Sequence, residues 1–131
     1  MRDALSNILV VDDDLICRKM LEYTIKEMGF EVVAVGSAKD AILQAKEHDF
    51  SLIFTDIGMP NMNGVELAAY LRQKLLIESP IIAITGHASR EDSELYKKAG
   101  INRFVEKPFT PEVFKNIIQV YNKVPTFRRP H

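Results

Sequence analysis

The sequence predicts an α/β fold in which five parallel strands form one open, doubly wound sheet. Two observations support this class. Short apolar runs recur along the chain, and segments with helical periodicity and helix start and stop signals lie between them. Because consecutive parallel strands need right-handed crossovers, this alternation favours a single sheet covered by helices on both faces.

The strand candidates are short runs that end in a turn or a polar residue. The first, third and fourth are apolar almost throughout, as central strands covered on both faces must be. The expected order in the sheet is flavodoxin-like, 2-1-3-4-5. The candidates are residues 7–11, 31–35, 51–55, 80–85 and 102–106.

Helix punctuation separates these runs. A glycine after an apolar residue indicates a left-handed helix stop, and a serine or threonine followed by an early acid indicates a helix start. The signals are Gly29 and Gly100 at helix ends, and Ser37 with Asp40, Ser89 with Asp92, and Thr110 with Pro111 and Glu112 at helix starts.

Length and composition favour one domain with a local functional site. The 131 residues are 47% hydrophobic, which suits one core, expected over residues 7–122 between an extension (1–6) and a tail or linker fragment (123–131). A net charge of -1 gives no footprint for direct nucleic-acid binding or membrane attachment. The single cysteine, Cys17, excludes an intrachain disulfide and a Cys-based zinc site. With no apolar run of transmembrane length, it favours a cytoplasmic protein.

Carboxylates follow two of the predicted strands at the point where each strand ends. Asp12, Asp13 and Asp14 follow the first strand, and Asp56 follows the third. These strands are neighbours in the expected order, so the side chains should crowd one crevice. Two such charges about 4 Å apart repel by roughly 4 kcal/mol at an effective dielectric near 20. A hard divalent cation reverses that energy, so the cluster predicts a Mg²⁺ site.

Two more strand ends should meet the same crevice. Thr85 ends the fourth strand with a hydroxyl, and Lys107 follows the fifth. A hydroxyl and an ammonium beside carboxylates form a pocket suited to phosphoryl oxygens. The arrangement predicts that Asp56 is a nucleophile that accepts a phosphoryl group as an acyl phosphate.

Four motifs, "ILVVDDD", "IFTDIGMPNMNG", "PIIAITGHA" and "FVEKPFT", occur in the order and spacing of a known family. Over nearly its full length the chain resembles the chemotaxis-type receiver domain of two-component response regulators. The resemblance implies a signalling domain rather than an enzyme. Such a domain takes a phosphoryl group from a sensor histidine kinase or histidine phosphotransfer protein, in a two-component or phosphorelay system, and then switches conformation. Phosphorylation-dependent self-association is compatible with it.

The resemblance also assigns the site. Asp56 would be the phosphoacceptor, and Asp13 and Asp56 would bind Mg²⁺ directly. Gly58 would bind it through its backbone carbonyl, and Asp12 through water. Thr85 and Lys107 would contact the phosphoryl group.

Further positions follow from the same resemblance. Phe104 would be an aromatic switch coupled to Thr85. Gly58 and His87 occupy positions that in receivers influence how water reaches the acyl phosphate, which leaves the lifetime of the phosphorylated state open.

Two alternatives stay open. A small phosphatase of the haloacid dehalogenase type would use Asp12 as nucleophile and Asp14 as acid/base, but it needs a late acidic pair that "VEKPFTPEVF" lacks. Asp14 is better explained as a helix N-cap. Within signalling, the chain has no room for a DNA-binding output domain. The sequence leaves open whether it acts alone or belongs to a larger kinase or regulator.

The first helix predicts a docking patch. At about 100° per residue, one arc forms its core face, and Leu15 and Ile16 lie off that arc beside the acidic residues. Apolar side chains at the rim of a site suggest contact with the helices of a phosphodonor protein. The predicted core face consists of Cys17, Met20, Leu21, Thr24, Ile25 and Met28.

Overall fold

The computed structural model describes residues 7–86 and 90–123, in which strands and helices alternate strictly. The strands are β1 (Asn7–Val11), β2 (Glu31–Val35), β3 (Leu52–Asp56), β4 (Ile81–Thr85) and β5 (Arg103–Glu106). The helices are α1 (Leu15–Glu27), α2 (Ala38–Glu47), α3 (Gly64–Gln73), α4 (Arg90–Lys98) and α5 (Pro111–Lys123). Every predicted strand is confirmed, with ends that shift by at most one residue.

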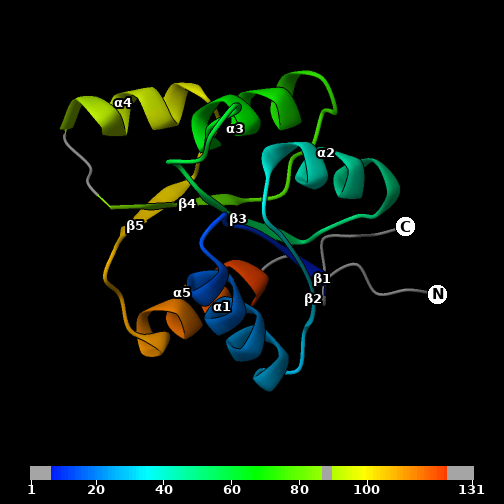
Figure 1. Ribbon diagram of the computed structural model, residues 1–131, viewed down its shortest axis with the longest axis vertical. Coiled ribbons are helices and arrows are strands. Elements are labelled where there is room, and N and C mark those ends of the chain that lie inside the picture. Colours follow the sequence, from blue (N-terminus) through cyan, green and yellow to red (C-terminus); the bar gives the residue numbers. More distant parts are fainter. Residues whose placement is uncertain (1–6, 87–89, 124–131) are drawn as a thin grey trace.

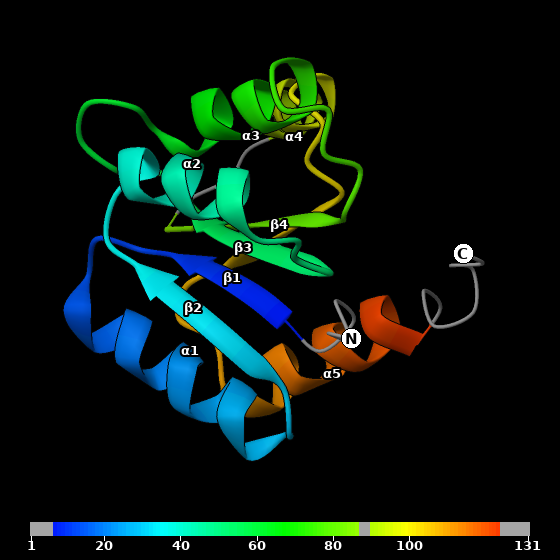
Figure 2. The same cartoon turned by 90° about the vertical axis from the view of Figure 1, so that its right-hand side faces the viewer.

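The strands form one parallel sheet in the order β2-β1-β3-β4-β5. Helices α2, α3 and α4 cover one face, and α1 and α5 cover the other (Figures 1 and 2). The predicted doubly wound class and strand order are therefore confirmed. Within the described ranges, no helix combines the length and apolarity needed to cross a membrane.

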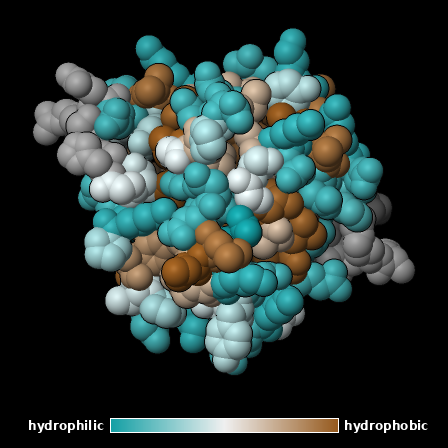
Figure 3. Space-filling view, in the orientation of Figure 1, coloured by the Kyte–Doolittle hydropathy of each residue, from teal (hydrophilic) through white to brown (hydrophobic). Residues whose placement is uncertain are grey.

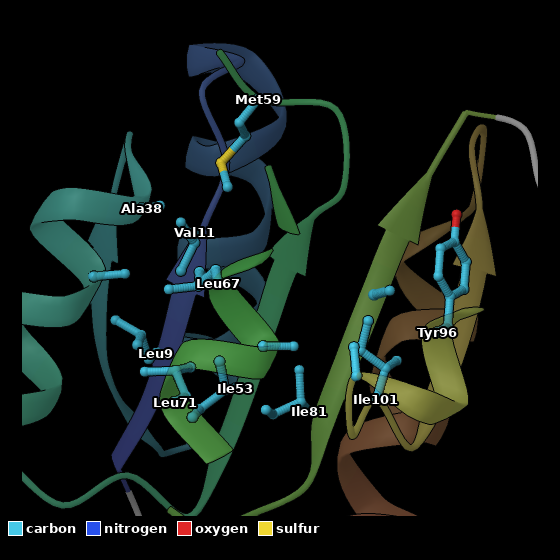
Figure 4. Packing of buried hydrophobic residues seen from close by; sticks show 14 of the residues in the cluster. Leu9, Val11, Ala38, Ile53, Met59, Leu67, Leu71, Ile81, Tyr96 and Ile101 are labelled. Carbon is cyan, nitrogen blue, oxygen red and sulfur yellow. The ribbon is translucent and has the colours of Figure 1, made fainter. Parts of the chain in front are cut away.

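Each face of the sheet carries its own apolar core. Strands β1, β3 and β4 are buried along their whole length, and their side chains point alternately to the two faces. In β1, Leu9 and Val11 join the core under α2, α3 and α4, and Ile8 and Val10 join the core over α1 and α5. Figure 4 shows the first of these cores.

Most of the predicted helix signals are confirmed. The Ser37 side chain accepts a hydrogen bond from the Asp40 backbone N–H at 3.1 Å, and Thr110 Oγ1 accepts one from the Val113 N–H at 3.3 Å. The predicted stops Gly29 and Gly100 have φ values of 92° and 94°, in the left-handed region. Ser89 and the extensions at 1–6 and 124–131 lie outside the described residues, while α5 includes Lys123.

The loop after β3 is held by contacts that the sequence analysis did not identify. Asn63 and Glu66 form a reciprocal capping box at the start of α3, with bonds of 3.0 and 2.9 Å. The Gly64 N–H donates to the Ile57 carbonyl at 2.9 Å. A Cβ on Gly64 would collide with the Asp56 carbonyl and would lie 2.8 Å from Ile57 Cα. Glycine therefore allows the start of α3 to pack directly on the end of β3.

Candidate functional site

The carboxyl ends of β1, β3, β4 and β5 bring the predicted site residues together. Val11 of β1 pairs with Thr55 of β3. Asp12 and Asp56, one residue further along each chain segment, therefore lie side by side. Asp56 pairs with Ile84, one residue before Thr85. The backbone N–H of Lys107 donates to the Thr85 carbonyl at 2.8 Å, which ties the fifth strand end to the fourth.

Three carboxylates form a compact acidic cluster. One oxygen each from Asp12, Asp13 and Asp56 lies within 4.8 Å of the others. Asp12 is fully buried and Asp56 is 7% exposed, whereas Asp13 faces solvent. At that separation each pair of charges repels by about 3 kcal/mol at an effective dielectric near 20. The cluster has the oxygen donors and the charge that a hard divalent cation prefers.

Asp12 presents an unsatisfied atom to this cluster. Its Oδ1 accepts a hydrogen bond from the Asp14 backbone N–H at 2.9 Å. Its Oδ2 is buried and has no hydrogen-bond partner in the part of the chain that the structure describes. A buried carboxylate oxygen without a partner is costly, so this atom is suited to a bound cation or its water.

Asp14 does not join the cluster. It is the N-cap of α1, with extended backbone, and its side chain accepts a hydrogen bond from the Ile16 N–H at 3.1 Å. The N-cap interpretation is confirmed.

Lys107 supplies the cation of the site. Its Nζ lies 3.7 Å from Asp56 Oδ2 and 3.9 Å from Asp12 Oδ2. Partial burial alone would lower the pKa of the ammonium, but the charges of Asp12 and Asp56 outweigh that effect and raise the pKa. Lys107 therefore remains charged and offsets part of the repulsion among the carboxylates.

The pKa of Asp56 depends on burial and on the charges of Asp12 and Lys107. Burial is the largest cause, and repulsion from Asp12 adds to it, so the pKa rises from the usual 3.8 to about 6 although Lys107 opposes the change. Asp56 is therefore mostly ionised at neutral pH, but it holds its charge less readily than an ordinary aspartate.

Thr85 and Phe104 lie on adjacent strands. Thr85 is buried at the end of β4, and Phe104 on β5 pairs with Ala83. The half-buried Phe104 ring packs edge-to-face against Tyr96 of α4, with centroids 5.7 Å apart. Tyr96 was not identified from the sequence, where it is one aromatic in a helical segment. The switching role of Phe104 stays a prediction.

Gly58 and His87 are the two positions predicted to influence the lifetime of the acyl phosphate. Gly58 is exposed in the loop after Asp56, where a Cβ would meet nothing within 4 Å. The metal-binding role of its carbonyl stays a prediction. His87 lies outside the described residues.

The predicted core face of α1 is confirmed. Leu21, Thr24 and Ile25 are buried, and the remaining members of the arc are partly buried against the same core. Leu15 and Ile16 are 54% and 80% exposed in the first turn. Figure 3 shows hydrophobic side chains gathered near the centre of a mostly hydrophilic face. The exposure of this pair leaves it accessible to another protein.

The predicted core position of Cys17 is confirmed. It packs against the core over α1 and α5, and its thiol also lies near Asp12 of the site. Burial, reinforced by the adjacent Asp12 carboxylate, raises the pKa of the thiol to about 12. Cys17 is therefore a neutral thiol and not a second nucleophile.

In metal-free protein, we expect Asp56 to titrate near pH 6 and Asp12→Asn to lower that pKa, because the variant removes the neighbouring charge. Carboxyl-carbon NMR in the presence of EDTA measures both values. A midpoint near 4 in the unsubstituted protein, or an unchanged midpoint in Asp12→Asn, would contradict the electrostatic account.

The same shift affects stability. Because the pKa of Asp56 is higher in the folded than in the unfolded chain, protonated Asp56 favours folding. That contribution is complete below about pH 4 and is lost as the pH rises through 6.

Known proteins resemble the chain in sequence. The family model for the response regulator receiver domain matches residues 8–119. A chemotaxis protein CheY homolog of Campylobacter jejuni is 34% identical over 86% of this chain and 88% of that protein. The sensor histidine kinase RcsC of Escherichia coli is 30% identical over 87% of this chain, a match that spans 12% of RcsC.

Solved structures agree with these relatives. The chemotaxis protein CheY4 of Vibrio cholerae is 29% identical, with a TM-score of 0.85 over 88% of this chain and 98% of that one. A CheY-like receiver domain protein from Methanospirillum hungatei is also 29% identical, with a TM-score of 0.84 over 89% of this chain and 93% of that one. None of these similarities supports the alternative of a haloacid dehalogenase-type phosphatase. The chain belongs to the response regulator receiver domain family.

Proposed function

We propose that this receiver domain accepts a phosphoryl group from a phosphohistidine onto Asp56, with Mg²⁺ as cofactor. The observation that carries the proposal is the placement of Asp56 against Asp12, Asp13 and Lys107. A structural role for these charges is a poor explanation, because Lys107 offsets only part of the repulsion among the three crowded carboxylates.

The residues present fit Mg²⁺. Asp13 and Asp56 would be direct ligands, the Gly58 carbonyl a third, and Asp12 a ligand through water. Two features support this assignment: the hard oxygen donors of the cluster, and the Oδ2 of Asp12, which has no hydrogen-bond partner among the described residues. When bound, Mg²⁺ would neutralise charge on the carboxylates and on the phosphoryl oxygens.

The side chains of the chain carry the transfer. A carboxylate oxygen of Asp56 forms the new O–P bond, the N–P bond of the phosphohistidine breaks, and the leaving imidazole takes up a proton from solvent. The ammonium of Lys107, 3.7 Å from Asp56 Oδ2 before transfer, offsets the charge of the phosphoryl group. The Thr85 hydroxyl donates to a phosphoryl oxygen.

Phosphorylation is then transmitted through Thr85 and Phe104. A shift of Thr85 toward the phosphoryl group would free space into which the Phe104 ring moves. Because that ring packs on Tyr96, its movement would change the packing of α4. The output is a changed surface and not a product of catalysis.

The phosphodonor would be a sensor histidine kinase or a histidine phosphotransfer protein that docks on Leu15 and Ile16. Their exposure at the rim of the acidic cluster supports this choice, as does the similarity to a segment of RcsC. A cytoplasmic location, the absence of direct nucleic-acid binding and any phosphorylation-dependent self-association stay predictions.

With acetyl phosphate and Mg²⁺, we expect the intact mass to increase by one phosphoryl group, because Asp56 is mostly ionised at neutral pH. Mass spectrometry measures the increase. Asp56→Asn and EDTA should each abolish it, whereas Asp49→Asn, at an acid remote from the cluster, should not. A mass increase that persists in Asp56→Asn would refute the proposed phosphoacceptor.

Recognition can be separated from chemistry with the variant Leu15→Glu/Ile16→Glu. We expect at least a tenfold slower transfer from the cognate phosphohistidine protein and nearly unchanged labelling by acetyl phosphate, because only the former needs the patch. Rapid-quench assays with both donors measure the two rates.

The control is Leu43→Glu, at a leucine of comparable exposure on α2, which should leave both rates unchanged. Equal loss with both donors would mean that Leu15 and Ile16 support the pocket itself. Unchanged transfer would mean that the donor docks elsewhere.

A further inference from the structure

Arg18 of α1 forms a hydrogen bond with the main chain of Asp12, a member of the acidic cluster. Its Nη1 donates a hydrogen bond to the Asp12 carbonyl at 2.8 Å. The Asp12 N–H donates to the Val35 carbonyl at 3.0 Å. Both backbone polar groups of Asp12 are therefore fixed, one by α1 and the other by β2.

Gly36 provides the space for this contact. A Cβ on Gly36 would lie 2.6 Å from Arg18 Nη1 and 3.5 Å from its Cζ. The φ of Gly36 is not in the left-handed region, so its backbone conformation does not require glycine. The close approach of the guanidinium is the contact that a side chain at position 36 would disturb.

We propose that Arg18, seated against Gly36, is a positioning residue that sets the orientation of the Asp12 and Asp13 carboxylates for Mg²⁺. This inference rests on the proposed function. The Arg18 bond fixes the peptide that joins Asp12 to Asp13, and rotation of that peptide would redirect both side chains. The Asp14 N–H holds Asp12 Oδ1, so a fixed main chain also determines where Oδ2 points, the oxygen that accepts no hydrogen bond from the described residues.

The acceptor of the Arg18 hydrogen bond explains how a positively charged side chain can support a site that binds Mg²⁺. The guanidinium donates its hydrogen bond to the Asp12 backbone carbonyl and not to the Asp12 carboxylate. Asp12 is thus held in place without losing the charge that Mg²⁺ requires. A lysine at position 18 would carry a compact ammonium in place of the planar guanidinium that packs against Gly36.

The experiment is a Mg²⁺ titration followed by backbone amide NMR. Arg18→Met keeps most of the aliphatic stem but removes the donor, and we expect its Mg²⁺ Kd to rise by about 10- to 100-fold, as for other residues that orient metal ligands. The matched control is Lys19→Met, at the adjacent exposed cation, which should keep the Kd of the unsubstituted protein.

Gly36→Ala tests the same contact without touching Arg18. The new methyl group would displace the far end of a flexible side chain, so the fold should tolerate it while the bond to Asp12 is lost. Because both substitutions remove one contact, the double variant should bind Mg²⁺ no more weakly than Arg18→Met alone. Fully additive losses would contradict a shared mechanism.

The outcomes separate the two proposals. If the unsubstituted protein binds Mg²⁺ and both Arg18→Met and Gly36→Ala keep its Kd, even with a lower free energy of unfolding, Arg18 has only a structural role and the inference is overturned. If the unsubstituted protein itself binds no Mg²⁺, the proposed function fails, and the inference fails with it.

Discussion

Repulsion among carboxylates at the ends of two neighbouring strands is the constraint on which the site depends. The sheet register places Asp12 and Asp56 side by side, and burial prevents water from screening them. Burial and the charge of Asp12 together raise the pKa of Asp56. Lys107 offsets part of the repulsion among the carboxylates, and a bound divalent cation would replace the remaining repulsion with attraction. The same energy that destabilises the metal-free chain would therefore favour cofactor and phosphoryl binding.

A rigid support is needed to hold such charges together, and the fold supplies it on both sides of the sheet. The loop after Asp56 is anchored by Met59, whose side chain enters the core near Val11 (Figure 4). The capping box at Asn63 and the close approach at Gly64 fix the other end of this loop. The cluster cannot relax by moving its loops apart, because core packing and backbone hydrogen bonds hold the loops in place.

The fold was predictable because each of its signals is local. Apolar runs, left-handed stops such as Gly29 and the periodicity of α1 act within a few residues, and the strand-end acids followed from the sheet order. The bond from Arg18 to the Asp12 carbonyl was not predictable, because a main-chain acceptor leaves no pattern in the sequence. The proximity of Cys17 to Asp12 likewise depends on how α1 packs. The capping box of Asn63 and Glu66 did have a readable Asn-x-x-Glu signal, which the sequence analysis missed.

The free energy of unfolding with and without Mg²⁺ tests the central claim most directly. Without Mg²⁺, Asp56→Asn should be more stable than the unsubstituted protein at pH 8, because it removes a crowded charge. Mg²⁺ at 100 times its Kd should stabilise the unsubstituted protein by about 2.7 kcal/mol and the variant by much less. An equal gain in both proteins, or a variant that is less stable in EDTA, would contradict the claim that carboxylate repulsion creates the site.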